Sequence, residues 1–316
     1  MGNASRRTVL MGHPAHFSVK GGANPHTRTR WGTRRHVDRE RAVAQWHGLK
    51  ATLEDLGVRV LVVPPCADWP GSVYPANAGF QTDPDADRPQ AEKTFYLSNL
   101  LPSRAGEKSL YRRLLAASGF PLAEFDPRYR FEGEADFFPA GDVYLFTCGA
   151  LERQRFVPAW RVPPWRRVYG FRSDARLEPR LAEIVAPRPV HRFELVLETH
   201  YHGDTALCAF GAHRQHLLVY RDAIAPDDWP RLVELFGDVL LPLAREDALH
   251  YAANSFALTL EGESYLVMPD SSSQHLRDQV RERGVTPIPV DVSEFLKKGG
   301  GSVKCMIGDL GVVTAG

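Results

Sequence analysis

The chain has 316 residues, and its 39 basic and 38 acidic side chains give a formal net charge of +1. This balance leaves no electrostatic footprint for nucleic acid or for an anionic membrane surface. Hydrophobic residues make up 43% of the chain and charged residues 24%, which is typical of a soluble globular protein with a substantial core. The N-terminus lacks the apolar core of a signal peptide, and no apolar run approaches the roughly 18 residues of a spanning helix. Four widely separated cysteines without a CxxC pair indicate neither zinc nor a disulfide framework, so we expect a reducing, cytoplasmic setting.

The predicted elements begin with a strand at residues 8–11, which leads into a polar segment at residues 12–35. A loop of that length in a compact domain is usually functional or disordered. An amphipathic helix is predicted for residues 37–56, because apolar side chains recur there at spacings of three and four. Gly57 gives the C-terminal stop of this helix, and residues 58–63 read as a buried strand.

A helix followed by a β segment recurs along the rest of the chain. Helices are predicted at residues 104–118, 173–185, 226–236 and 271–283. Pro179 is expected to kink the second of these helices. Apolar runs on either side of Gly262 predict a hairpin of residues 255–260 and 264–268.

The five predicted helix positions lie roughly 45 to 70 residues apart, which indicates repetition of one supersecondary unit in a radial or solenoid arrangement. An ordinary doubly wound sheet also alternates strands and helices, but it favours a glycine-rich first turn that is absent here. No segment has the composition of a linker between domains. We therefore predict one α/β domain, residues 1–316, with weak fivefold internal repetition.

The stretch with the clearest chemical signal lies near the C-terminus. Residues 299–301 are three consecutive glycines, and Cys305 follows four positions after the last of them. Glycines permit backbone angles and close approaches that other residues do not tolerate. A flexible glycine run that presents one thiol is typical of a nucleophile on a substrate-facing loop. The alternative is a glycine-rich hairpin with a buried, inert cysteine.

Three further polar clusters are candidates for chemistry. Three carboxylates lie within residues 132–136 beside an apolar strand, where they are costly unless solvated or paired with a cation. His202 and Asp204 leave an apolar strand together, and Asn77 ends a loop of small residues. The alternatives are an exposed acidic turn, a structural hydrogen-bonded pair and a simple turn residue. His200 and His202 lack a third ligand of clear spacing, so no metal site is predicted.

One chemistry uses all of these clusters, namely attack on a guanidinium group. Carboxylates and an amide oxygen suit a planar cation with five donors. Its central carbon is a poor electrophile, so attack requires a thiolate, and a histidine would protonate the departing amine and later activate water. No metal or organic cofactor is needed. The residues predicted to perform this chemistry are Cys305, His202, Glu132, Asp136, Asp204 and Asn77.

Six segments carry a family resemblance, and they are residues 11–17 with 23–25, 73–79, 101–107, 131–136, 201–208 and 294–306. In this order they resemble the motifs of the guanidine-modifying superfamily. That superfamily includes arginine deiminases, dimethylarginine dimethylaminohydrolases and amidinotransferases. The chain looks most similar to its dimethylaminohydrolase-like and arginine-dihydrolase-like branch, and the resemblance covers nearly the whole sequence.

The resemblance implies a five-bladed α/β propeller (pentein) of ββαβ-type repeats, with the active site on the pseudo-axis. It implies Cys305 as a nucleophile that forms a covalent thiouronium intermediate, and His202 as the acid/base. The implied substrate is a small guanidine, and the implied reaction uses no cofactor. The resemblance leaves open whether the protein forms a homodimer. The residues that would hold the guanidinium are Glu132, Asp136, Asp204 and Asn77, and those that would hold the amino acid end are Asn24 and Arg104.

The chain departs from the family pattern at Gly71, Pro75, Ala135, Gly203 and Ile307. Because the nucleophile and the acid/base are kept, we expect a hydrolase that acts on arginine or a substituted relative. An amidinotransferase, in which a second amine attacks the thiouronium, shares the first half of the reaction. A non-catalytic binding protein that retains the fold is the third alternative, and inertness of the Cys305 thiol would favour it.

Overall fold

The computed structural model describes residues 5–19, 24–29, 31–151, 155–160 and 164–314. Within these residues, the chain forms five units that share one order of strands. In each unit two antiparallel strands are followed by a helix, which crosses over to a third strand that pairs in parallel with one of the first two. Parallel pairing needs such a crossover, which explains why each predicted helix leads into a strand.

The first unit joins the two ends of the chain, because the C-terminal strand pairs with the N-terminal one. It consists of β18 (Gly308–Thr314), β1 (Arg6–Gly12), α1 (Arg39–Asp55) and β2 (Arg59–Val63). The second unit consists of β3 (Gly79–Gln81), β5 (Phe95–Leu97), α2 (Glu107–Ala117) and β6 (Leu122–Glu124).

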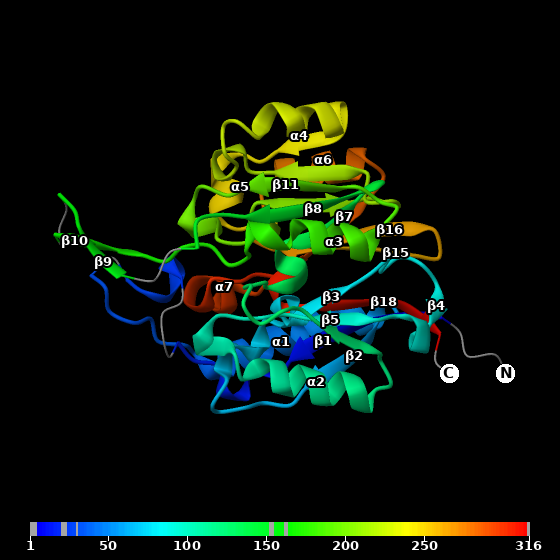
Figure 1. Cartoon of the computed structure of the whole chain (residues 1–316), viewed down its shortest axis with the longest axis horizontal. Helices are drawn as coiled ribbons and strands as arrows, with labels where there is room; N and C mark the ends of the chain where they lie inside the picture. The colour runs from blue at the N-terminus through cyan, green and yellow to red at the C-terminus, as the bar shows by residue number, and fades with distance from the viewer. Residues whose placement is uncertain (1–4, 20–23, 30, 152–154, 161–163, 315–316) are drawn as a thin grey trace.

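The other three units have the same pairing. The third consists of β7 (Phe137–Ala140), β8 (Val143–Cys148), α3 (Glu178–Val185) and β11 (Val190–Glu194). The fourth consists of β12 (Leu207–Phe210), β13 (His216–Val219), α4 (Trp229–Phe236) and β14 (Leu240–Pro242). The fifth consists of β15 (Phe256–Leu260), β16 (Glu263–Pro269), α6 (Gln274–Glu282) and β17 (Thr286–Val290). In Figure 1, α1 and α2 lie on one side of the strands and α4 and α6 on the opposite side.

The remaining elements lie outside this repeat. They are the edge strand β4 (Arg88–Pro89), the hairpin of β9 (Arg155–Pro158) and β10 (Trp165–Val168), and the short helices α5 (Arg245–Leu249) and α7 (Ser293–Gly299). The hairpin projects from the body of the molecule in Figure 1. None of the helices in the described ranges is long and apolar enough to cross a membrane.

The five predicted helices and the β15–β16 hairpin are confirmed at their predicted positions, with ends that differ by a few residues. The predicted kink at Pro179 is wrong. This proline lies in the first turn of α3, where the missing N–H has no helical acceptor to lose. The β segment that follows α3 is β11, which runs from Val190 to Glu194.

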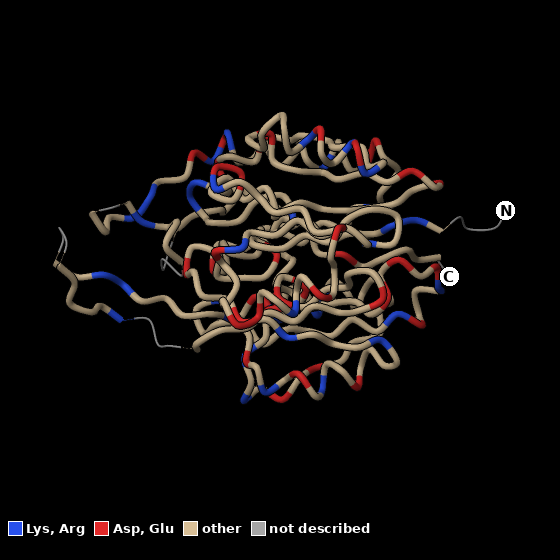
Figure 2. The backbone as a smooth tube through the Cα atoms, turned by 90° about the horizontal axis from the view of Figure 1, so that it is seen from above, with Lys and Arg blue, Asp and Glu red and all other residues tan. Residues whose placement is uncertain are grey.

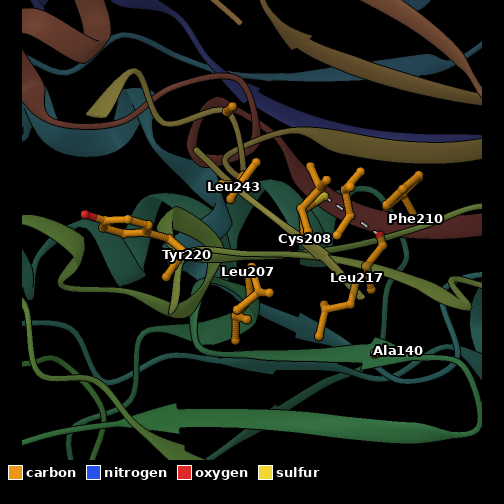
Figure 3. Close-up of a cluster of buried hydrophobic side chains, with 14 of the residues drawn as sticks. Ala140, Leu207, Cys208, Phe210, Leu217, Tyr220 and Leu243 are labelled. Atoms are coloured by element: carbon orange, nitrogen blue, oxygen red, sulfur yellow. Dashed lines mark hydrogen bonds between the residues drawn. The ribbon is translucent and has the colours of Figure 1, made fainter. Parts of the chain in front are cut away.

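The largest apolar core lies around the fourth unit. Figure 3 shows Leu207, Phe210, Leu217 and Leu243 packed together in this core with Cys208 among them. Burial raises the pKa of the Cys208 thiol to about 12. Cys208 is therefore a core residue, in contrast to the cysteine of the site described below.

Charges of both signs are interspersed over the chain in Figure 2. One group of charges is largely buried and links distant segments. Arg7 on β1, 1% exposed, pairs with Asp309 on β18 and with Asp85, to which its Nη1 lies at 2.7 Å. Arg214, after β12, pairs with Asp85 at 2.6 Å and with Asp309 at 3.3 Å. Because each buried charge has an opposite partner, the group holds the first and fourth units together without an uncompensated ion.

Two glycines of the third unit should differ sharply in their tolerance of a methyl group. Gly133 and Gly141 both have left-handed φ angles, of +64° and +57°. A Cβ at Gly133 would lie 2.4 Å from the Gly79 carbonyl oxygen, whereas a Cβ at Gly141 would meet nothing within 4 Å. We expect Gly141→Ala to lower the free energy of unfolding by about 1–2 kcal/mol, the left-handed penalty alone. Gly133→Ala should add a backbone clash of roughly 1–3 kcal/mol. Urea unfolding followed by circular dichroism measures both, and equal losses would contradict the packing.

Candidate active site

A cavity of about 140 Å³ brings together residues that are far apart in the sequence. Six of the eight predicted site residues, all within the described ranges, line it: Asn24, Asn77, Arg104, Glu132, His202 and Cys305. The other two, Asp136 and Asp204, are buried residues outside this lining. The structure therefore assembles the predicted clusters at one place, and the position of each side chain decides what it can do.

Cys305 lies on the short turn between α7 and β18 and is 2% exposed. The glycines before it are required by packing. A Cβ at Gly299 would lie 1.8 Å from the Tyr74 hydroxyl, and one at Gly301 would lie 2.6 Å from the Tyr74 ring. Gly300 ends α7 with a φ of +80°. The glycine run thus lets the chain pass Tyr74 closely and turn the thiol into the cavity.

The Cys305 sulfur contacts a carboxylate and an amide. Its Sγ lies 3.5 Å from Oδ2 of Asp204 and 3.2 Å from Nδ2 of Asn254. Burial, and then the charge of Asp204, raise the pKa of the Cys305 thiol well above its usual range. These surroundings therefore favour the neutral thiol of Cys305. A cation between the sulfur and Asp204 would favour the thiolate.

His202 pairs with Glu132 at the same cavity. The imidazole Nε2 lies 2.9 Å from Oε2 of Glu132, whose other oxygen accepts the backbone N–H of Leu101 at 3.2 Å. Burial would raise the pKa of Glu132, but the hydrogen bond and charge of His202, with the charges of Arg172 and Arg104, lower it to about 2. Glu132 is thus an ionised carboxylate that orients the imidazole, as a general acid/base requires.

Asp136 lies outside the cavity lining and fixes the turn that carries His202. Its Oδ1 accepts from the Thr147 hydroxyl at 2.9 Å and from the Gly203 N–H at 3.0 Å, and its Oδ2 accepts from the Ser173 hydroxyl at 2.6 Å. A Cβ at Gly203 would lie 2.3 Å from the Thr147 hydroxyl oxygen. This contact explains why the departure from the family pattern at residue 203 is a glycine.

Asp204 differs from Asp136 because its hydrogen-bonding capacity is not filled. Its Oδ2 faces the Cys305 sulfur, and its Oδ1 has no hydrogen-bond partner among the residues that the structure describes. Burial raises the pKa of Asp204 to about 6. A buried carboxylate with an open oxygen beside a thiol is a place for a cation with N–H donors.

Arg104 is tied to neighbouring side chains. Its Nε and Nη2 donate to the two oxygens of Glu107 at 2.9 and 2.8 Å, and its Nη1 donates to Oδ1 of Asn77 at 2.8 Å. Its Nη2 also reaches the Gly71 carbonyl oxygen at 3.1 Å. A Cβ at Gly71 would lie 2.5 Å from Oε1 of Glu107. The Glu107 carboxylate therefore takes the space beside Gly71, a second departure that the packing explains.

Asn24 joins the N-terminal loop to the glycine run. Its Nδ2 donates to the Gly299 carbonyl oxygen at 2.8 Å and to the Tyr201 hydroxyl at 3.1 Å. The Tyr201 hydroxyl in turn donates to the Gly300 carbonyl oxygen at 2.7 Å. Residue 23 of the predicted motif lies outside the described residues, but Asn24 itself lines the cavity.

Sequence reasoning missed several residues of the site. Arg172, 2% exposed, lines the cavity with its guanidinium carbon 4.9 Å from the centre of the Tyr201 ring. Glu107 lies in a segment that resembles a family motif, and this position could have been singled out. Arg172 and Asn254 stand in no motif, so only the fold brings them to the site. Among the described residues, no group of three His, Cys, Asp or Glu side chains could hold a metal ion.

Known proteins resemble this chain over nearly its whole length. The family model described as N,N dimethylarginine dimethylhydrolase, eukaryotic, matches residues 202–312. The chain is 30% identical over 312 residues to N(G),N(G)-dimethylarginine dimethylaminohydrolase of Mycobacterium tuberculosis, with 96% of this chain and 88% of the relative covered. It is 30% identical over 308 residues to the bifunctional arginine dihydrolase/ornithine cyclodeaminase AgrE of Nostoc, covering 96% of this chain and 37% of the relative.

A solved structure has the same fold. The N-terminal domain of ArgZ, covalently bound to a reaction intermediate, superimposes with a TM-score of 0.78 at 23% identity. The match covers 98% of this chain and 100% of that one. The mixed α/β fold is thus shared across the length of both chains. As the sequence motifs predicted, the chain belongs to the dimethylarginine dimethylaminohydrolase and arginine-dihydrolase-like family of the guanidine-modifying superfamily.

Proposed function

We propose that this protein is a cysteine-dependent hydrolase that cleaves a C–N bond at the guanidinium carbon of arginine or an N-substituted arginine. The observation that carries the proposal is the cavity lined by Cys305 and the His202–Glu132 pair, with the open carboxylate of Asp204 beside the sulfur. The relatives named above are hydrolases of arginine or dimethylarginine by their names. Nucleophile, acid/base and cation-binding carboxylate are the three parts that this reaction needs.

The five units would form the five blades of an α/β propeller around a pseudo-axis. Their common order of strands and common pairing support this arrangement. The cavity receives residues from the first, second and third units and from the segments that join the units. A site on the axis of a propeller would collect side chains in this way.

Two sets of charged side chains would bind the two ends of the substrate, carboxylates at the guanidinium and arginines at the α-carboxylate. The guanidinium would lie against Asp204, where the open Oδ1 accepts its N–H groups, with Glu132 close by. The α-carboxylate would pair with Arg172, which is buried, and with Arg104, which is partly exposed; both guanidinium groups line the cavity. Asn77 would act through Arg104, whose Nη1 it holds, and Asn24 would place the N-terminal loop over the amino acid end.

The reaction would begin with proton transfer from the Cys305 thiol to His202 once the guanidinium cation lies beside the sulfur. The thiolate then bonds to the guanidinium carbon, and the imidazolium gives its proton to the departing nitrogen as the C–N bond breaks. An amine and an S-alkyl thiouronium remain. Water then attacks the same carbon while His202 takes its proton, and the C–S bond breaks to release a urea product. Each turnover consumes one water and releases one amine.

Isotope labelling tests hydrolysis directly. In H₂¹⁸O, arginine, monomethylarginine and dimethylarginine are each incubated with the enzyme, and the products are identified by mass spectrometry. We expect one ¹⁸O atom in the urea product and one equivalent of ammonia, methylamine or dimethylamine from the substrate that is used. Product formation that requires an added amine and carries no label would contradict hydrolysis and indicate amidino transfer.

Cys305→Ser should abolish turnover, by at least about 10³-fold, while the fold is unchanged, because an alcohol does not replace a thiolate as nucleophile. Intact-protein mass spectrometry should show a substrate-derived adduct on the unaltered enzyme and none on the variant. Cys66→Ser is the matched control, since Cys66 is a free thiol that does not line the cavity. Turnover retained by Cys305→Ser would remove Cys305 from the mechanism.

His202→Ala should separate the two halves of the reaction. A substrate with a good leaving group needs no proton from the imidazole, so the covalent adduct should still form. Its hydrolysis should slow by about 10²–10⁴-fold, because no base activates the attacking water. Quenched-flow mass spectrometry would follow the adduct with time. An adduct that disappears at the rate of the unaltered enzyme would exclude His202 as the base.

Asp204→Asn should make the free thiol more acidic and the enzyme less active. The carboxylate charge disfavours the thiolate, so its removal lowers the pKa of Cys305. Alkylation by iodoacetamide, a neutral reagent, should therefore be faster at pH 8 in the variant, whereas kcat/KM should fall because the cation loses its carboxylate. In the unaltered enzyme kcat/KM should decline below about pH 6, where Asp204 takes up a proton. Slower alkylation of the variant would contradict the placement of this charge.

A further inference from the structure

Asn254 lies beneath the cysteine turn and is completely buried. Its Nδ2 donates to the Cys305 sulfur at 3.2 Å and to the Asp204 carbonyl oxygen at 3.0 Å. Its Oδ1 accepts the backbone N–H groups of Ser302 at 2.9 Å and of Cys305 at 3.0 Å. Its own carbonyl oxygen accepts the N–H of Lys304 at 3.0 Å.

This pattern uses the full capacity of a primary amide. The two N–H groups of Nδ2 donate to the sulfur and to a carbonyl oxygen. The two lone pairs of Oδ1 accept hydrogen bonds from two backbone N–H groups. The acceptor side fixes the backbone of the cysteine turn, and the donor side faces the reacting atom. An aspartate at this position would keep the acceptor but lose the donors, and an alanine would lose both.

The sulfur has opposite electrostatic neighbours. A carboxylate oxygen of Asp204 contacts the sulfur and disfavours a negative charge on it. Asn254 donates an N–H group to the sulfur, which favours a negative charge. The hydrogen bond from Asn254, and that from the Ser302 backbone, act on the pKa of the Cys305 thiol in the opposite direction to burial and to the Asp204 charge. When a guanidinium binds to Asp204, the Asn254 N–H group is already positioned to donate a hydrogen bond to the thiolate.

We propose that Asn254 is a catalytic residue, whose Nδ2–H stabilises the Cys305 thiolate before it attacks and again when it is expelled from the tetrahedral intermediate. This inference rests on the proposed function for its role in turnover. The geometry of the amide and the sulfur stands without it. The donor is preorganised, because the three other hydrogen bonds of the same amide hold it in position.

The experiment compares Asn254→Asp and Asn254→Ala with Ser255→Ala. Ser255 is the matched control, since it lies on the same buried segment and its hydroxyl bonds to the Ala252 carbonyl oxygen and not to the cysteine turn. The pKa of the Cys305 thiol is measured from the pH dependence of iodoacetamide alkylation, with the alkylated residue identified by mass spectrometry. Circular dichroism establishes that each protein is folded.

We expect the thiol pKa to rise by about one to two pH units in both Asn254 variants, because a hydrogen bond to a charged group is lost. Alkylation at pH 8 should slow by about 10-fold or more, and kcat should fall by about 10²-fold, as for other lost donors to a developing anion. Ser255→Ala should leave all three quantities unchanged. Asn254→Ala is needed beside Asn254→Asp, because the aspartate charge alone would raise the thiol pKa.

A thiol pKa that is unchanged in folded Asn254→Ala overturns the proposal, even if kcat falls, because the residue would then only support the turn. If Asn254→Ala does not fold, the same measurement on Asn254→Leu decides, because leucine is close to asparagine in size, carries no charge and offers no N–H donor. An unchanged pKa in that variant again contradicts the proposal. The alkylation assay needs no substrate. A raised thiol pKa in a protein that turns over no guanidine would thus refute the proposed function and leave the thiolate donor in place.

Discussion

A buried carboxylate must be paired or hydrogen-bonded, and the site is organised by how each carboxylate meets this requirement. Glu132 pairs with His202, Glu107 with Arg104, and Asp136 with two hydroxyls and a backbone N–H. Asp204 keeps one oxygen without a hydrogen-bond partner among the described residues. At these four positions the carboxyl group therefore lies beside an imidazole, a guanidinium, a set of neutral donors or a thiol. Asp204 is the position at which a substrate cation would complete the site.

Glycine positions decide how closely the segments of the site approach one another. The glycine run passes the Tyr74 ring at distances that no side chain permits, and Gly203 fits against Thr147. At Gly71 the neighbouring space holds the carboxylate of Glu107. Two departures from the family pattern thus have a local physical reason. They alter the packing around the site, and Cys305 and His202 still line the cavity.

The repeating fold was predictable because its signals are local. The apolar spacing of α1 and the glycine or proline that follows each helix indicate helix-to-strand units without knowledge of the tertiary structure. The short helices α5 and α7 and the β9–β10 hairpin were not predicted, because few residues in them repeat an apolar spacing. The sequence does not show whether Pro179 lies in the first turn or in the interior of a helix, because the helix boundary is not known from the sequence. The predicted kink at Pro179 was wrong for this reason.

The sequence by itself determined the kind of chemistry. One thiol after a glycine run, a histidine near a carboxylate and an acidic segment define it through residue types and local order. Only the tertiary structure decided which carboxylate does what, and it placed Asp136 on the turn of His202 and Asp204 beside Cys305. It also brought Asn254 and Arg172 to the site. The reason is that these hydrogen bonds join residues 51 to 101 positions apart, and no local pattern records which distant partner fills a hydrogen bond.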